Sequence, residues 1–136
     1  MSHDLGFFSV KQGATTAEVR AAYLSSCEGV DPLWSSSEAL KSFISALENQ
    51  YPCIETISED KVDNSPWSCG FDRGNGHIIV SMVFSRAPEV GNFIWGLLER
   101  HELIVFDPQA DKAYLGNNEL PENRKAKKCW QFWNKK

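Results

Sequence analysis

The stretch HELIVFDPQADKAYLG, residues 101–116, decides the fold of this chain. Its apolar run at residues 103–106 stops abruptly at Asp107-Pro108-Gln109, and a second short run follows at residues 113–115. Aspartate suits the first position of a turn because its carboxylate accepts a hydrogen bond from the backbone two residues further on. Proline then fixes φ at the next position. We therefore interpret Asp107-Pro108-Gln109 as the corner of a β-hairpin and not as the edge of a catalytic site.

Two capping boxes upstream of this hairpin predict the starts of helices. In a capping box, a Ser or Thr and a Glu three residues later each accept a hydrogen bond from the other's backbone N–H group. The pattern occurs at Thr15 and Glu18, and again at Ser35 and Glu38. The first helix is expected to end near Gly29, because glycine readily adopts the left-handed conformation that terminates helices.

The second of these helices has the clearest apolar face in the chain. Its apolar residues recur at helical spacing up to the stop at Pro52, and they are Leu40, Phe43, Ile44, Leu47 and Tyr51. A third helix is predicted to begin near Pro88, which suits a first helical turn. It is expected to end at His101, as a cation near the helix C-terminus.

Strands account for most of the remaining sequence. Segments rich in aromatic and β-branched residues predict strands at residues 5–11, 53–57, 68–73 and 77–84. Gly74-Asn75-Gly76 favours a hairpin between the last two, and residues 59–66 are a loop by composition. The strand at 77–84 is apolar on both faces, which indicates a central position. The order predicts an α+β fold, a largely antiparallel sheet with helices packed on one face.

The length of 136 residues and the apolar content of 42% suit one domain with a substantial core. We predict a single α+β domain at residues 1–120 and a basic, aromatic C-terminal helix or tail at residues 121–136. The longest apolar segment, residues 78–84, is too short to span a bilayer, and the N-terminus lacks the pattern of a signal peptide. The expected location is therefore the cytoplasm.

No motif predicts catalysis, cofactor binding or a metal site. The four cysteines, Cys27, Cys53, Cys69 and Cys129, form no CxxC pair, and the three histidines supply no cluster with them. We expect reduced thiols that are mostly small buried apolar groups. Asp107 and Asp111 lie four residues apart, but nothing nearby predicts the burial that would shift a carboxyl pKa. A phosphate loop, GxSxG and HExxH are missing from the sequence.

The net charge of −4 conceals a strong asymmetry. Residues 1–123 contain all 18 acidic and 8 of the 14 basic residues, a formal charge of −10, while residues 124–136 carry +6. An acidic body disfavours nucleic acid as the main partner and favours a basic protein. The basic tail suits an anionic membrane or a nucleic acid, but docking of its aromatic residues on the acidic body is the favoured interpretation.

The sequence resembles a group of small bacterial immunity proteins encoded beside polymorphic or contact-dependent toxins. The resemblance spans residues 1–116 and rests on four short motifs: Met1-Ser2-x-Asp4-Leu5, Tyr51-Pro52, Pro66-Trp67 and Asp107-Pro108-Gln109. Two features depart from the pattern. Glu102 stands where these proteins have glycine after the histidine that closes the last helix, and the lysine-rich tail has no counterpart.

This resemblance implies function by binding, without catalytic residues or a small-molecule substrate. The expected partner is a cognate toxin domain, a basic protein of the nuclease class, which an acidic inhibitor would occlude. The predicted partner-binding residues are the acids Glu55, Glu59, Asp60 and Asp63, with Trp67 as an aromatic anchor. The alternative for Trp67 is core packing, and the alternative for the acids is an ordinary solvated loop. Two alternatives remain at the level of sequence. One is a small enzyme with a Cys/His or carboxylate site, and the other is an adaptor that binds nucleic acid or membrane through its tail.

Overall fold

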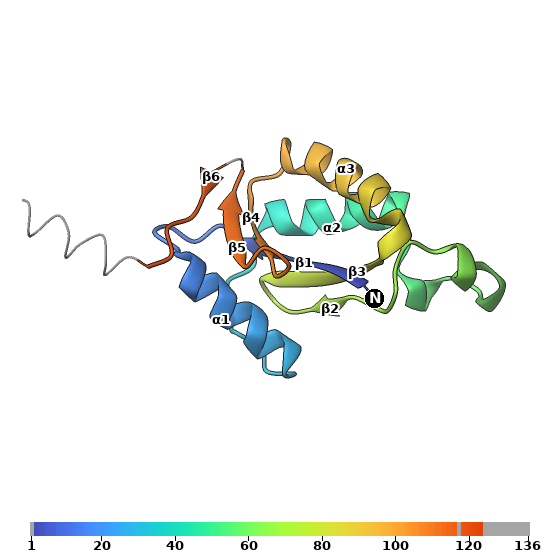
Figure 1. The fold of residues 1–136 in the computed structure, drawn as a ribbon, viewed down its shortest axis with the longest axis horizontal. Helices are drawn as coiled ribbons and strands as arrows, with labels where there is room; N and C mark the ends of the chain where they lie inside the picture. Colours follow the sequence, from blue (N-terminus) through green and yellow to red (C-terminus); the bar gives the residue numbers. More distant parts are fainter. Residues whose placement is uncertain (1, 117, 124–136) are drawn as a thin grey trace, which may run out of the picture.

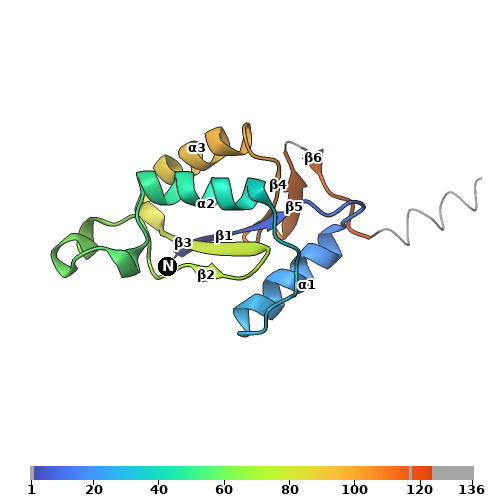
Figure 2. The same ribbon diagram turned by 180° about the vertical axis from the view of Figure 1, so that it is seen from behind.

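A computed structural model describes residues 2–116 and 118–123, and its elements are drawn in Figures 1 and 2. Six antiparallel strands form one sheet in the order β2-β3-β1-β4-β5-β6. Their bounds are β1 Ser2–Ser9, β2 Asp72–Arg73, β3 His77–Val83, β4 Leu103–Asp107, β5 Lys112–Leu115 and β6 Asn118–Glu119. The predicted α+β class and antiparallel sheet are confirmed. None of the helices in these described ranges is long and apolar enough to cross a membrane.

The helices cover both faces of the sheet, which corrects the prediction of a single covered face. Helices α2 (Glu38–Gln50) and α3 (Ala87–Leu98) pack on one face, and α1 (Thr16–Cys27) packs on the other (Figures 1 and 2). The neighbours Phe7 and Phe8 of β1 show the reason, because both are fully buried and they join different apolar clusters. Strands that are apolar at consecutive positions need cover on both sides.

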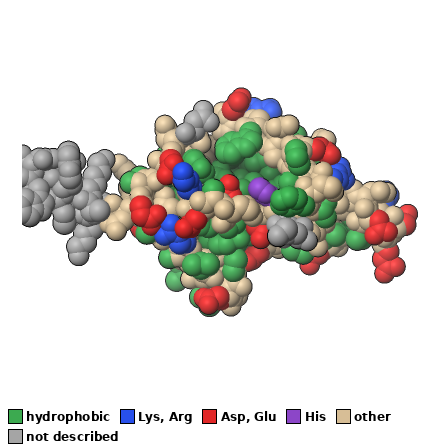
Figure 3. Space-filling model, in the orientation of Figure 1, with side chains coloured by type: hydrophobic (Ala, Val, Ile, Leu, Met, Phe, Trp, Pro, Cys, Tyr) green, Lys and Arg blue, Asp and Glu red, His purple; other side chains and the backbone are tan. Residues whose placement is uncertain are grey.

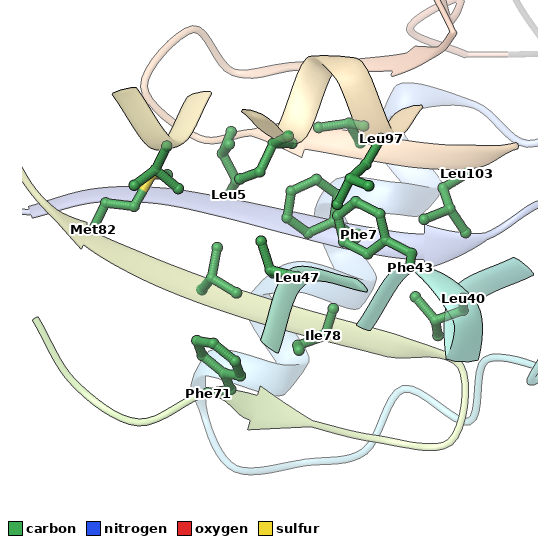
Figure 4. Close-up of a cluster of buried hydrophobic side chains, with 14 of the residues drawn as sticks. Leu5, Phe7, Leu40, Phe43, Leu47, Phe71, Ile78, Met82, Leu97 and Leu103 are labelled. Carbon is green, nitrogen blue, oxygen red and sulfur yellow. The ribbon is translucent and has the colours of Figure 1, made fainter. Parts of the chain in front are cut away.

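The larger cluster lies between the sheet and the pair α2 and α3 (Figure 4). The members labelled in the close-up are Leu5, Phe7, Leu40, Phe43, Leu47, Phe71, Ile78, Met82, Leu97 and Leu103. The smaller cluster lies under α1, where Tyr23 contacts Phe106 with ring centroids 5.0 Å apart. The apolar face predicted for α2 is therefore core, with Leu40, Phe43 and Leu47 fully buried.

One of the two predicted capping boxes is confirmed and the other is wrong. Thr15 caps α1, with its hydroxyl and the carboxylate of Glu18 each accepting at 3.2 Å from the other's backbone N–H group. The cap of α2 is Ser37, whose hydroxyl accepts from the N–H of Leu40. Ser35 is instead held against the β2–β3 turn, where a β-carbon on Gly76 would come within 2.2 Å of the Ser35 carbonyl oxygen.

Both predicted hairpins form. Asp107 Oδ1 accepts from the backbone N–H of Gln109 at 3.0 Å, which makes Asp107-Pro108-Gln109 the corner between β4 and β5. The Gln109 side chain also extends the sheet, because its Oε1 accepts from the Asp4 N–H and its Nε2 donates to the Asp4 carbonyl, each at 2.9 Å. The first arm of the Gly74-Asn75-Gly76 hairpin is reduced to the two residues of β2.

Two segments differ from their predicted conformation. The strand predicted at residues 53–57 is the 3₁₀ turn η1 (Ile54–Thr56), in which both the backbone N–H and the hydroxyl of Thr56 donate to the Cys53 carbonyl. The loop predicted at residues 59–66 contains the 3₁₀ helix η2 (Glu59–Asn64). Most of the predicted C-terminal helix, residues 124–136, lies outside the described residues, and residues 121–123 are not helical.

Candidate partner-binding site

Residues 53–66, here called the acidic loop, project beyond the end of α2 (green, at the right of Figure 1). The loop is closed at its base, where the Trp67 Nε1–H donates to the Tyr51 carbonyl at 2.9 Å. The returning chain then pairs with β3, as the N–H of Val83 donates to the Pro66 carbonyl at 2.7 Å. A compact surface loop with closely spaced, fixed ends is a common carrier of binding function.

Trp67 is buried, so of its two predicted roles the structure supports core packing and not an exposed aromatic anchor. Its side chain is 1% exposed and meets Phe71 edge to face, with centroids 4.9 Å apart. A second edge-to-face contact joins it to Tyr51 at 6.2 Å. The indole belongs to the core because it needs both an apolar environment for its rings and a carbonyl for its N–H. Trp67 affects the surface only indirectly, because its hydrogen bond to Tyr51 holds the acidic loop in position.

Three of the four predicted acids lie together on the loop. Glu59, Asp60 and Asp63 are exposed on η2, whose turns are closed by backbone bonds from Lys61 to Ser58 and from Ser65 to Val62. The acidic side chains at the far right of Figure 3 mark this projection. None of the three carboxylates forms an ion pair with a described lysine or arginine.

Glu55 lies apart from these three, closer to the base of the loop. Its carboxylate accepts from the Cys53 thiol at 3.9 Å, and it folds over Gly70, where a β-carbon would lie 2.5 Å from Glu55 Oε1. The structure therefore separates the predicted set. Glu59, Asp60 and Asp63 form one acidic surface, while Glu55 and Trp67 belong to the base that holds it.

Most lysines and arginines of the described residues form ion pairs with acids outside the acidic loop. Eight lysines and arginines lie in residues 2–123, and six of them form ion pairs with carboxylates: Lys11, Arg20, Lys41, Arg73, Arg86 and Lys112. Outside the acidic loop, these ion pairs engage seven of the 14 acids of residues 1–123, and the formal charge there is −7. The acidic loop, with four carboxylates and Lys61, keeps a formal charge of −3. None of these ion pairs reaches the acidic loop, so its own carboxylates set the negative field of this projection.

A further contact fixes the second half of the loop to α3. The Arg86 guanidinium donates to the Asn64 carbonyl and also to the Glu89 carboxylate, which lies 2.8 Å from Nη2. These bonds to Arg86, and a bond from the Tyr51 hydroxyl, lower the pKa of Glu89. Tyr51 and Arg86 both donate hydrogen bonds to Glu89. The two ends of the acidic loop are therefore held by the same hydrogen-bond network.

A second polar cluster joins α1 to the β2–β3 hairpin, and sequence reasoning missed it. The Ser26 hydroxyl donates to Asp72 Oδ2 at 2.9 Å and lies 2.7 Å from Nε2 of the buried His77. A serine-histidine-aspartate triad needs the carboxylate on the other ring nitrogen of histidine. Here Asp72 approaches the same Nε2, at 3.9 Å, and His77 Nδ1 has no hydrogen-bond partner among the described residues.

This geometry indicates a structural role for the cluster of Ser26, Asp72 and His77. The His77 ring stacks on Phe8 and lies so close to Gly74 that a β-carbon there would come within 2.1 Å of the ring. The imidazole has no room for a substrate, and its hydroxyl and carboxylate partners tie α1 to the sheet edge. The only sequence signal is the histidine that begins an apolar strand, because Ser26 lies 51 residues away.

The cysteines also differ from expectation. Cys53 is buried, but Cys27 and Cys69 are exposed, and Cys129 lies outside the described residues. Partial burial is the main cause that raises the pKa of the Cys27 thiol, which disfavours the reactive thiolate. Within residues 2–116 and 118–123, no group of three His, Cys, Asp or Glu side chains is placed to hold a metal ion.

Comparison with known proteins gives one distant similarity. The chain is 32% identical over 88 residues to the probable G-protein coupled receptor K01A12.3 of Caenorhabditis elegans. The match covers 62% of this chain and only 17% of the receptor's length. No family model and no solved structure matches the chain.

Proposed function

We propose that this protein works by binding, with the acidic loop as the surface that captures a basic partner protein. The partner is a cognate bacterial toxin domain of the nuclease class, in keeping with the resemblance to immunity proteins, and the site of action is the cytoplasm. One observation carries this proposal. Glu59, Asp60 and Asp63 are exposed without cationic partners in the described residues, on a loop that is fixed at both ends.

Two physical effects make such a loop suitable for capture. A loop already held in one conformation loses little conformational entropy on binding, so more of the contact energy appears as affinity. Its negative field meets the positive surface that a nuclease needs for phosphate, and complementary fields accelerate encounter. Fast encounter suits an inhibitor, because the toxin must be stopped before it cleaves nucleic acid.

The test is protection of bacteria that express the cognate toxin domain, which this proposal expects to be encoded beside the chain. Cells that also express the natural chain should survive, and the variant E59Q/D60N/D63N should protect them poorly. The matched control is E28Q/E99Q/E102Q, which removes the same charge from three exposed acids outside the loop. This control should protect as the natural chain does. Equal protection by both variants would exclude the acidic loop, and death of cells carrying the natural chain would exclude immunity.

A further inference from the structure

An apolar trough runs along α1 on the face of the sheet opposite α2 and α3. It consists of two adjoining hollows of about 690 Å³ and about 480 Å³, which share Val10 and Lys11. Leu120 and Pro121 line the first hollow, and Leu33 and Trp34 line the second. We call this surface the α1 trough.

The far end of the trough presents the Leu33 side chain to solvent, and this side chain is 87% exposed. Leu33 also has φ of 59°, a left-handed conformation that a bulky residue rarely adopts. The Asp31 carboxylate holds this turn by accepting from the Leu33 N–H at 2.8 Å. The turn therefore holds Leu33 out from the surface beside the trough.

The near end of the trough is where the described chain finishes. The N–H groups of Thr16 and Ala17 donate to the carbonyls of Pro121 and Glu122, which places this strand-like segment against the start of α1. Arg20 then binds the Glu122 carboxylate through two hydrogen bonds, at 2.7 and 2.9 Å. The described chain thus ends two residues after Pro121, a residue that lines the trough.

The composition of residues 124–136 matches this surface. The segment contains Trp130, Phe132 and Trp133 together with six lysines and arginines and no acid. The trough offers apolar surface, and the exposed Glu28 and Asp31 near its far end form no ion pair with a described lysine or arginine. Aromatic side chains would supply the missing cover, and the basic groups would meet these acids.

Length and attachment favour the chain's own segment over a separate molecule. The 12 residues of α1 extend for roughly 18 Å, at about 1.5 Å per residue. Thirteen residues span that distance whether helical or extended. A segment joined to the wall of its own site also has an effective concentration in the millimolar range, which a free partner seldom reaches. We propose that residues 124–136 cover the α1 trough of the same chain through their aromatic side chains.

The experiment measures the accessibility of a thiol placed in the trough of the full-length chain. Ala21, an exposed residue of α1 that lines the trough, is changed to cysteine after Cys27, Cys69 and Cys129 have been replaced by serine. Ser45→Cys is the matched control, because Ser45 is exposed on α2 across the sheet. The buried Cys53 stays in both proteins, and its lack of reaction confirms that each is folded.

The two tryptophans of the segment are then replaced, as W130S/W133S. Alkylation at position 21 should become about tenfold faster, which corresponds to about 1.4 kcal/mol of lost docking free energy. The rate at position 45 should not change, and Q131S/N134S should leave both rates unchanged. An unchanged rate at position 21 in W130S/W133S would overturn the proposal. Protection that disappears on dilution would also overturn it, because a second copy would then be the occupant.

Discussion

The hairpin corner at Asp107 allows a quantitative test of the fold. Asp107 Oδ1 accepts from the Gln109 backbone N–H at 3.0 Å, from Gln109 Nε2 at 2.7 Å and from the Ala110 N–H at 3.4 Å. The replacement Asp107→Ala removes all three bonds. It also frees the Gln109 side chain, which bridges to the backbone of Asp4. The Asp107 side chain thus stabilises the pairing of β4 with β1 as well as the turn itself.

The expected cost follows from the number and exposure of these bonds. A net contribution of about 1 kcal/mol per hydrogen bond, reduced for a partly exposed site, gives about 1.5 kcal/mol for Asp107→Ala. An unfolding entropy of roughly 2.1 cal/mol/K per residue gives about 290 cal/mol/K for 136 residues. The melting temperature should therefore fall by about 5 °C.

Thermal and urea unfolding followed by circular dichroism measure this change. Asp107→Asn is the control, because its amide oxygen can still accept from the turn, and it should lose less than half as much stability. An unchanged melting temperature for Asp107→Ala would refute the role of the side chain. Equal losses for the two variants would refute the hydrogen-bond explanation.

Two further predictions concern side chains that stabilise the fold. Glu122→Gln should destabilise the protein at neutral pH, and this difference in melting temperature should disappear at a pH below the lowered pKa of Glu122. Its bonds to Arg20 hold the pKa of Glu122 below the ordinary 4.5, so this stabilisation is present above 4.5 and is lost as the pH falls through the lowered value. Trp67→Ala should cost about 3–5 kcal/mol in urea unfolding, whereas loss of binding at unchanged stability would restore its role as a contact residue.

Local sequence patterns predicted the elements that local chemistry determines. The turn at Asp107, the capping box at Thr15 and the apolar face of α2 all depend on neighbours within a few residues, and all are confirmed. Ser35 shows the limit of such patterns. It satisfies a capping box in sequence, but contact with Gly76 of a distant hairpin holds it outside the helix.

Long-range contacts account for the other differences. Consecutive apolar residues in β1 already required cover on both faces, but no local pattern showed which helix would supply it. Similarly, the composition of the acidic loop predicted exposed acids, and Glu59 and Asp60 are exposed. It did not show that Trp67 would reach back to the Tyr51 carbonyl, 16 residues earlier, and thereby become buried. The Ser26 and His77 pair was hidden for the same reason.

The kinetics of association with the proposed partner, a cognate toxin domain, test the central claim most directly. Stopped-flow association rates should be measured from low salt to about 0.15 M, where the Debye length is about 8 Å. The natural chain and the control E28Q/E99Q/E102Q should both slow steeply with salt. E59Q/D60N/D63N should associate more slowly at low salt and depend less on it, with a smaller change in dissociation. Identical salt dependence for E59Q/D60N/D63N and the control would show that position on the acidic loop is irrelevant, and would contradict the account.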